Sequence, residues 1–337
     1  MRYAGLDSLR LAAAALVLLA HGAFFLYPLL PRYDLWLGLG WVGTELFFAL
    51  SGFLLIRVLL QNPSHSTAAF LRSRLARVLP IFWVFVAINL LLWWWQHSAL
   101  PQRWWAYPAL LQNSWALHPD FFAEAWNLPP LLFFWLLAVA LVNRALSHLD
   151  TRTRLQNGLL LLASVGLLLR LALVSVLDPS WDLGVRKWLP MRLDACAWGG
   201  VLACWQAREP SIGRHQTIAL SGLALALFSL VLFAVLPRDS SLFARSGLFS
   251  MIGLACALPL PWLCRGVSTS TLATAAGGVF ALYLVNMPLI QLAAVFGVSA
   301  IGALPAFVLW LATSLVCAWV LATGMARLRL VRQRLLR

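Results

Sequence analysis

Charged residues are scarce in this chain. Asp, Glu, Lys and Arg make up 11% of its 337 residues, whereas a soluble domain carries about a quarter. Hydrophobic residues make up 62%, so too few charges remain to build a surface that faces water on all sides. The composition therefore excludes an ordinary water-soluble globular protein and indicates a protein embedded in a lipid bilayer.

Lysine is nearly absent, since Lys187 is the single one, and arginine carries the net charge of +14. On a soluble protein this charge would suggest nucleic acid as a partner. Here the arginines gather at the ends of apolar segments, where they are typical topology signals and contacts to lipid headgroups. We therefore expect the bilayer, and not nucleic acid, as the partner of this charge.

The sequence contains no CxxC pair and no cluster of metal-ligand type. All five cysteines lie in apolar segments, where we interpret them as small packing residues. They are Cys196, Cys204, Cys256, Cys264 and Cys317. We expect no metal site.

Long apolar runs dominate the chain. The stretch from Leu11 to Leu30, for example, contains no formally charged residue, and ~20 apolar residues in a helix span the ~30 Å hydrocarbon core. We predict an all-α, polytopic membrane protein of about ten transmembrane helices, forming a single transmembrane domain over 1–337 without an appended soluble domain. The predicted spans are 8–28, 40–60, 78–96, 126–143, 156–177, 189–207, 216–236, 246–264, 273–296 and 302–326.

Arg-rich connections alternate with connections of mixed charge. The segment 57–77 contains arginines and no acidic residue, whereas 97–125 and 178–194 contain both signs. Cytoplasmic loops are enriched in Lys and Arg, so the alternation predicts that both termini are cytoplasmic. The predicted cytoplasmic arginines of the tail are Arg327, Arg329, Arg332, Arg334 and Arg337.

Tryptophan is abundant, with 18 residues, and several of them fall near the predicted outer face. These are Trp93–Trp95, Trp104, Trp105, Trp115 and Trp126. Trp is enriched at membrane interfaces, which favours an aromatic belt. A platform that stacks on a sugar or a lipid headgroup is the alternative, and tryptophan content does not choose between them.

Two titratable residues inside predicted spans stand out, His21 and Glu45, because charge in a bilayer is costly and function is the first hypothesis. Arg10 and His21 are eleven residues apart in the first span, so they share one helix face at a separation of roughly 16 Å. Glu45 lies near the outer end of the second span, which places it at a depth similar to that of His21. A carboxylate beside an imidazole suits a general base, and a structural ion pair is the alternative.

Arg72, Arg74 and Arg77 crowd the inner end of the third span. They are either positive-inside anchors or an anion cradle, because guanidinium groups bind phosphates in a bidentate manner. A cradle at the cytoplasmic face would suit a phosphorylated cytosolic donor.

Four sequence stretches together resemble the acyltransferase family 3 membrane proteins, bacterial O-acyltransferases of surface glycans and other acceptors. Leu6-Asp-Ser-Leu-Arg10 followed by His21 is similar to the family's Arg/Lys-x10-His motif, and Glu45-Leu-Phe-Phe-Ala-Leu-Ser-Gly-Phe53 to its second-helix element. Arg74-Leu-Ala-Arg77 is similar to Arg-x-x-Arg, and Arg192-Leu-Asp194 with Gly199 to Arg-x-Asp-x-x-x-x-Gly.

The resemblance implies acyl transfer from acyl-CoA, usually acetyl-CoA, to a hydroxyl of an envelope glycan or similar acceptor at the bacterial inner membrane. His21 would be the catalytic histidine, with Glu45 in support. Arg10, Arg72, Arg74 and Arg77 would bind the donor, and Arg192, Asp194, Trp126 and Asn286 are candidate substrate-binding residues.

The chain departs from the family pattern at two places. Trp126-Asn-Leu-Pro-Pro-Leu131 stands where many members carry Trp-Ser-Leu-Ser-x-Glu, and Asn286 stands where many carry the His of Leu-Tyr-Leu-x-His. Asn286 forms hydrogen bonds but takes up no proton. Two other functions are therefore kept as alternatives, namely a transporter or flippase that uses His21 and Glu45, and a non-catalytic scaffold of an envelope assembly.

Overall fold

The computed structural model describes residues 2–30, 32–61, 67–117, 120–146, 150–209 and 211–335. Its regular structure in these ranges is helical, apart from one isolated bridge between Tyr3 and Val267. The side chains of the tail arginines named above (Arg327, Arg329, Arg332 and Arg334) and all of Arg337 lie outside this description.

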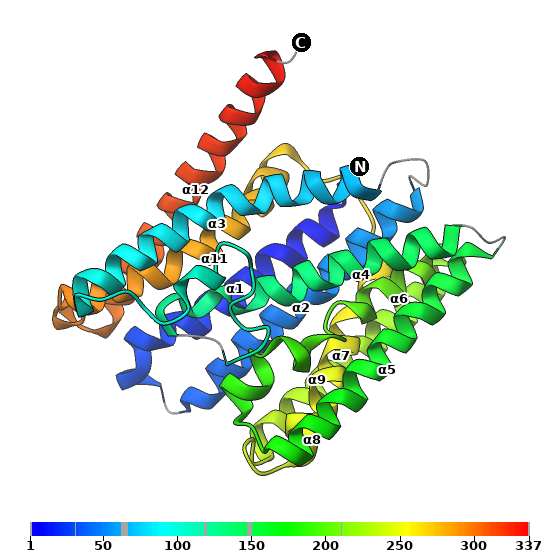
Figure 1. Ribbon diagram of the computed structural model, residues 1–337, viewed down its shortest axis with the longest axis horizontal. Helices are drawn as coiled ribbons and strands as arrows, with labels where there is room; N and C mark the ends of the chain where they lie inside the picture. Colours follow the sequence, from blue (N-terminus) through cyan, green and yellow to red (C-terminus); the bar gives the residue numbers. More distant parts are fainter. Residues whose placement is uncertain are drawn as a thin grey trace. The chain divides into compact units, whose positions relative to one another are not determined.

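The helices follow one another along the whole chain (Figure 1). The long ones are α1 (Ala4–Leu26), α2 (Tyr33–Gln61), α3 (Thr67–His97), α4 (Leu128–Leu146), α5 (Thr151–Leu177), α7 (Ile212–Val235), α11 (Ser270–Val295) and α12 (Ala303–Leu335). The shorter ones are α6 (Ala197–Gln206), α8 (Leu242–Arg245), α9 (Gly247–Ala257) and α10 (Leu260–Leu263). The 3₁₀ segments are η1 (Tyr27–Leu29), η2 (Trp104–Ala106), η3 (Asp120–Asn127, kinked at Phe122), η5 (Leu189–Arg192) and η6 (Val298–Ile301), and η4 (Trp181–Arg186) is a short π-helix.

The described chain separates into two compact units, which we describe one at a time. The first unit comprises residues 1–44 and 265–337, and the second comprises residues 45–264. The boundary falls within α2. The first unit therefore contains α1, α11 and α12, and the second contains the helices from the greater part of α2 to α10.

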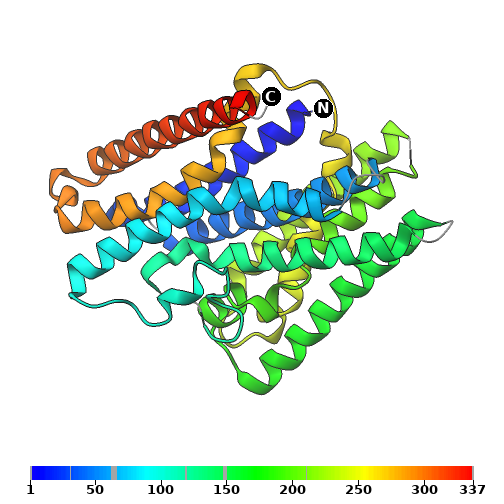
Figure 2. The same cartoon turned by 45° about the horizontal axis from the view of Figure 1, so that its top comes forward.

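In the first unit, α1, α11 and α12 pack against one another (Figure 1). Figure 2 shows α11 and α12 as an antiparallel pair joined through η6. Arg2 at the start of α1 donates to the carbonyl of Ala273 at the start of α11, and His21 near the end of α1 meets Asn286 farther along α11. Because the contacts occur in the same order, α1 and α11 run parallel.

In the second unit, the segment between α5 and α7 runs from one end of α5 back to the other, and it consists of the short helices η4, η5 and α6 instead of one continuous helix. Ala207 and Arg208, just after α6, bond to Arg152, Thr153 and Gln156 at the start of α5. The end of α6 therefore lies beside the start of α5, and η5 lies against the interior of α5. The chain returns across the unit through η5 and α6, with only the second half of the predicted span 189–207 in one helix.

The segment α9–α10 crosses in the same way. Arg245, two residues before α9, pairs with Asp178 just after α5. At the other end of the crossing, Gln206 at the end of α6 donates to the carbonyl of Pro261 in α10. Pro259 and Pro261 interrupt this segment, since proline removes a backbone donor, so it forms two short helices.

The described residues therefore form about ten helical crossings, which agrees with the predicted number of transmembrane helices. Eight helices among the described residues are long and apolar enough to cross a membrane, and the two broken segments add the remaining crossings. Irregular backbone at membrane depth requires burial within protein, and Met191, Arg192 and Asp194 of the broken segment are all buried. The predicted all-α class is confirmed.

Glycines bring α2 and α6 into close contact within the second unit. A Cβ at Gly52 would overlap the carbonyl of Cys196, and a Cβ at Gly199 would overlap the carbonyl of Ala49. Small residues at such crossings let membrane helices approach closely. Backbone atoms cannot move aside as a side-chain tip can, so α2 and α6 have no room for a methyl group.

We expect Gly199→Ala to lower the apparent melting temperature of the detergent-solubilised protein, because overpacking a tight contact costs about 1–3 kcal/mol. Gly277→Ala is the matched control, since a Cβ at Gly277 of α11 meets no atom within 4 Å. Alanine is favoured over glycine in a helix by roughly 0.5–1 kcal/mol, so the control should be neutral or stabilising. Equal effects of the two changes would contradict the close packing of α2 and α6.

Candidate active site

His21 of α1 and Asn286 of α11 are in direct polar contact inside the first unit. Nδ1 of the imidazole lies 2.6 Å from Oδ1 of the amide. Asn286 is fully buried, and His21 is partly exposed. Asn286 is a substrate-binding candidate by its sequence, and the fold places it directly against His21.

The amide of Asn286 is held in one orientation. Its Nδ2 donates to the backbone carbonyls of Leu282 and Tyr283, at 3.1 and 2.7 Å. The backbone carbonyl of Asn286 accepts from Nε1 of Trp310 at 2.9 Å. The Nδ2 contacts direct Oδ1 toward His21. Because an amide oxygen only accepts, Nδ1 of His21 carries the proton, and Nε2 of the neutral ring is the nitrogen with the lone pair of a base.

Arg10 lies near the other end of α1 in an ionic cluster. Asp7 accepts from Arg10 at 2.5 Å and from Arg2 at 3.0 Å. Asp7 is buried, with 1% of its side chain exposed, whereas 28% of the Arg10 side chain is exposed. Asp7 is part of the Leu6–Arg10 motif, and it holds Arg10 in place by this ion pair.

Glu45 and Arg192 form a buried ion pair in the second unit. Arg192 donates through Nη2 to Oε1 of Glu45, and their side chains are 1% and 0% exposed. The guanidinium of Arg192 also lies over the rings of Phe48 and Phe249, at 5.3 and 4.8 Å. This contact joins α2 to the broken segment at η5. The expected pairing of Glu45 with His21 stays a prediction.

Asp194 forms a second buried ion pair with Arg170 of α5. Nη1 and Nη2 of Arg170 donate to Oδ1 and Oδ2 of Asp194, at 2.9 and 2.7 Å. Arg170 also donates to the carbonyls of Met191 and Ser246. Ser250 of α9 donates to the same carboxylate at 2.6 Å. This network ties the irregular backbone around η5 to α5 and α9.

Sequence reasoning missed Arg170, although the signal was present. It is an arginine in the middle of the predicted span 156–177, and it is fully buried. A charge at that depth predicts a buried partner. Asp194, named as a substrate-binding candidate, is that partner.

Trp126, another substrate-binding candidate, is packed into the second unit. It is 3% exposed. Its ring lies edge-on to Phe48 at 5.8 Å and under the guanidinium of Arg186 at 5.3 Å. By contrast, Trp105 and Trp115 stack at 5.9 Å and are about half exposed. The exposure of Trp105 and Trp115 agrees both with an aromatic belt at the membrane interface and with a platform that stacks on a ligand.

Arg72, Arg74 and Arg77 lie on the first turns of α3, within the second unit. Arg72 and Arg77 are exposed and Arg74 is partly buried, with its guanidinium over the ring of Phe70 at 5.0 Å. The exposed pair is available to an anion. Among the described residues, no group of three His, Cys, Asp or Glu side chains could hold a metal ion.

A family comparison decides among the functions left open by the sequence. The model of the acyltransferase family 3, an acyltransferase domain, matches residues 3–323. The chain belongs to this family. Neither a search of curated proteins nor a search of solved structures finds a match.

Family membership identifies the protein as a membrane acyltransferase. The match extends from the start of α1 into α12, so it includes both His21 and the broken segment at η5. The matched acyltransferase domain therefore consists of the helices described above.

We expect Asp194→Asn to destabilise the acyltransferase strongly, because removing one partner of a buried ion pair costs about 3–5 kcal/mol. Ser250→Ala is the matched control on the same carboxylate. It removes two hydrogen bonds, one donated to Asp194 and one accepted from Arg170, each worth about 0.5–1.5 kcal/mol, and leaves the ion pair in place. The apparent melting temperature in detergent should fall far more for Asp194→Asn, and similar small changes in both would contradict a structural role for the pair.

Proposed function

We propose that this acyltransferase transfers an acyl group, acetyl in the simplest case, from cytosolic acyl-CoA to a hydroxyl of an envelope glycan or similar acceptor. The proposed location is the bacterial inner membrane, and His21 is the proposed general base. The observation that supports this role is the contact between Nδ1 of His21 and Oδ1 of Asn286, at 2.6 Å. It leaves Nε2 as the acceptor of a proton.

The reaction divides into two balanced steps. Nε2 of His21 takes the proton of the acceptor hydroxyl as the oxygen attacks the thioester carbonyl. The tetrahedral intermediate then collapses to the ester and expels the thiolate of CoA, which takes the proton back from Nε2. His21 ends neutral and ready for another cycle, and no metal enters the scheme.

Asn286 is a positioning residue in this scheme. Imidazole has two neutral tautomers, and only the form with the proton on Nδ1 offers Nε2 as a base. The two bonds from Nδ2 of Asn286 to the carbonyls of Leu282 and Tyr283 prevent the amide from offering a donor to Nδ1. An asparagine can therefore supply orientation to the base without any uptake of protons.

The donor is assigned to Arg10, Arg74 and Arg77 on the basis of the family motifs, and to Arg72 because it lies beside them at the start of α3. Exposed Arg72 and Arg77 suit the phosphates of CoA, because guanidinium groups bind phosphates in a bidentate manner. Arg10, which Asp7 holds in place, is the proposed contact near the start of α1. A raised KM for acyl-CoA would be the signature of these roles.

Glu45 stays in the proposal as the carboxylate that supports the base, as the family motif implies. Its ion pair with Arg192 fixes the position of the carboxylate. Arg192 and Asp194, both buried and both paired, are proposed to keep this region in shape instead of touching the acceptor. The family match favours transfer over the transporter and scaffold alternatives.

We expect His21→Ala and His21→Gln to reduce transfer by about 10²–10⁴-fold, the usual contribution of a general base. The measurement follows label from radiolabelled acetyl-CoA into envelope glycans, lipids and free acetate in membranes with matched protein levels. His97→Ala is the matched control, because His97 is an exposed residue at the end of α3 that stacks on Trp93. Transfer at the wild-type rate by His21→Gln would sink the mechanism.

We expect Asn286→Leu to lower kcat on the order of ten- to a hundredfold, the usual effect of losing a partner that orients a histidine. KM for acyl-CoA should change little. Asn286→Asp keeps an acceptor oxygen and should retain more activity than the leucine variant. Asn89→Leu is the control, since Asn89 is also buried in a span and also donates to its own helix, at Phe85. Equal losses for Asn286→Leu and Asn89→Leu would assign both residues to packing alone.

A further inference from the structure

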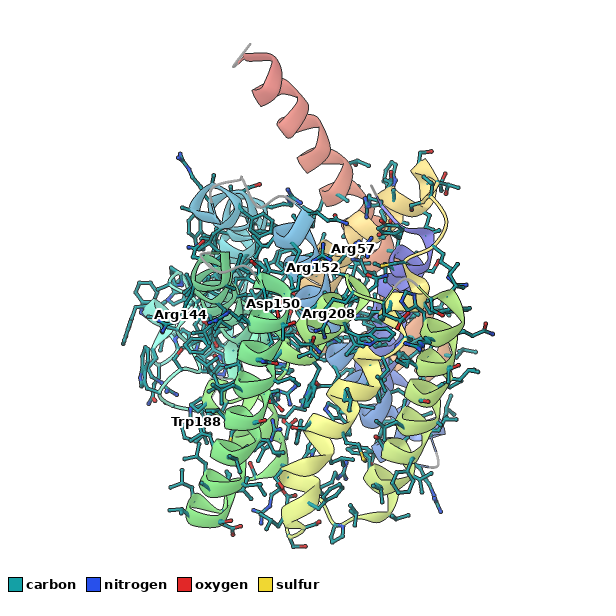
Figure 3. All side chains as sticks on the ribbon, turned by 90° about the vertical axis from the view of Figure 1, so that its right-hand side faces the viewer. Arg57, Arg144, Asp150, Arg152, Trp188 and Arg208 are labelled. Atoms are coloured by element: carbon teal, nitrogen blue, oxygen red, sulfur yellow. The ribbon has the colours of Figure 1, made fainter. Side chains whose placement is uncertain are left out.

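A pocket lies at the Arg-rich end of the second unit, where the ends of α2 and α6 meet the starts of α5 and α7. Its volume is about 360 Å³. The polar side chains that line it are Arg57, Gln61, Arg152, Gln206, Glu209 and His215. Figure 3 shows Arg57, Arg152 and Arg208 gathered at this end. None of the residues assigned above to catalysis or to donor binding lines this pocket.

The two arginines of the pocket are held in place by neutral acceptors. Arg57 donates to Oε1 of Gln206 and to Sγ of Cys264, and Gln206 is itself fixed by the carbonyl of Pro261 at 3.1 Å. Arg152 donates to the carbonyl of Ala207 at 2.8 Å. A guanidinium has five N–H donors, and the bond of Arg152 to Ala207 uses one of them. The charges are therefore positioned before any ligand binds.

The acidic residue in the wall does not cancel this positive charge. The N–H of Ser211 and the guanidinium of Arg214 bond to the carboxylate of Glu209 and hold its pKa below its usual value. Glu209 is therefore ionised at neutral pH, and Arg214 balances its charge. Arg57 and Arg152 leave the pocket with a net positive charge.

The inner wall is built around His215, which is 7% exposed. Its Nε2 donates to the carbonyl of Glu209 at 2.9 Å, and Trp205 meets its ring edge-on at 5.2 Å. A buried imidazole fixed on two sides adds a polar group to a rigid wall. The pocket thus combines two positioned guanidinium groups, amide side chains and a histidine.

We propose that this pocket binds a phosphate group, with Arg57 and Arg152 as its principal contacts. Guanidinium groups match phosphate oxygens in charge and in geometry. The volume is near the lower end of the ~300–1,000 Å³ range of small-molecule sites, so it suits a phosphate-bearing headgroup or one end of a nucleotide. The site does not depend on the acyl-transfer reaction proposed above.

Two sources can supply the phosphate. Anionic lipid headgroups lie at the membrane surface, where basic residues attract them. Soluble phosphates, including those of coenzyme A, can reach a pocket at the membrane surface from the aqueous side. The chemistry of recognition is shared, so the experiment has one arm for each source.

The variant is Arg152→Gln, whose amide can keep the bond to the carbonyl of Ala207 while the charge is lost. Arg154→Gln is the matched control, because Arg154 is an exposed arginine in the same first turn of α5 and does not line the pocket. Arg152→Lys retains the charge and removes the bidentate geometry. Melting temperatures of all variants check that each full-length protein is folded.

In the soluble arm, protein in phosphatidylcholine nanodiscs is titrated with pyrophosphate and with coenzyme A. In the lipid arm, native mass spectrometry counts phosphatidylglycerol retained from mixed nanodiscs. We expect Arg152→Gln to lower affinity about tenfold in one arm, as for the loss of one charge-assisted hydrogen bond, with Arg152→Lys intermediate and Arg154→Gln unchanged. A loss in the soluble arm identifies a soluble phosphate, and a loss in the lipid arm identifies a headgroup. Equal behaviour of Arg152→Gln and Arg154→Gln in both arms would overturn the proposal.

Discussion

Arg170 lies in the second half of an apolar helix of 27 residues and is fully buried, so water is not available to solvate its guanidinium. A charge at that depth requires an anion and hydrogen-bond acceptors from the protein. Asp194, Ser250 and the carbonyls of Met191 and Ser246 supply them. The same contacts satisfy backbone that the broken segment leaves outside a helix, so one ionic network stabilises both the buried charge and the irregular chain.

This constraint extends to Glu45 through its neighbours. Arg192 is two residues from Asp194, and its partner is the carboxylate of Glu45. Each ion pair joins one carboxylate to one guanidinium. The ring of Phe249 lies beside both guanidinium groups, so the two pairs share one buried region. The backbone that holds Asp194 therefore also fixes Arg192, and through it the carboxylate that the family motif places with the base.

At His21 the first unit meets the same requirement with neutral groups, whereas its buried Asp7 is paired with Arg2 and Arg10. Asn286 satisfies its amide nitrogen on its own helix and turns its oxygen to His21. No ionised partner is needed at this depth, which avoids the cost of a buried carboxylate. The substitution of the family's histidine by asparagine thus leaves a hydrogen-bond acceptor that selects one tautomer of His21.

The sequence by itself determined the membrane setting, the helical class, the approximate number of crossings and the family. Length and apolarity of a run are enough for the first three, because the bilayer accepts few other structures, and the four motifs indicated the family. It also drew attention to His21 and Glu45, since titratable groups are rare in spans, and to Arg192 and Asp194 through the resemblance to the family. Only the tertiary structure assigned the partners: Asn286 to His21, Arg192 to Glu45, and Arg170 to Asp194. Hydropathy gives the depth of a side chain along its helix but not the face that a neighbouring helix presents to it. For that reason the span 189–207 was predicted as a continuous helix, whereas its first half is held by contacts from α5 that lie far away in the sequence.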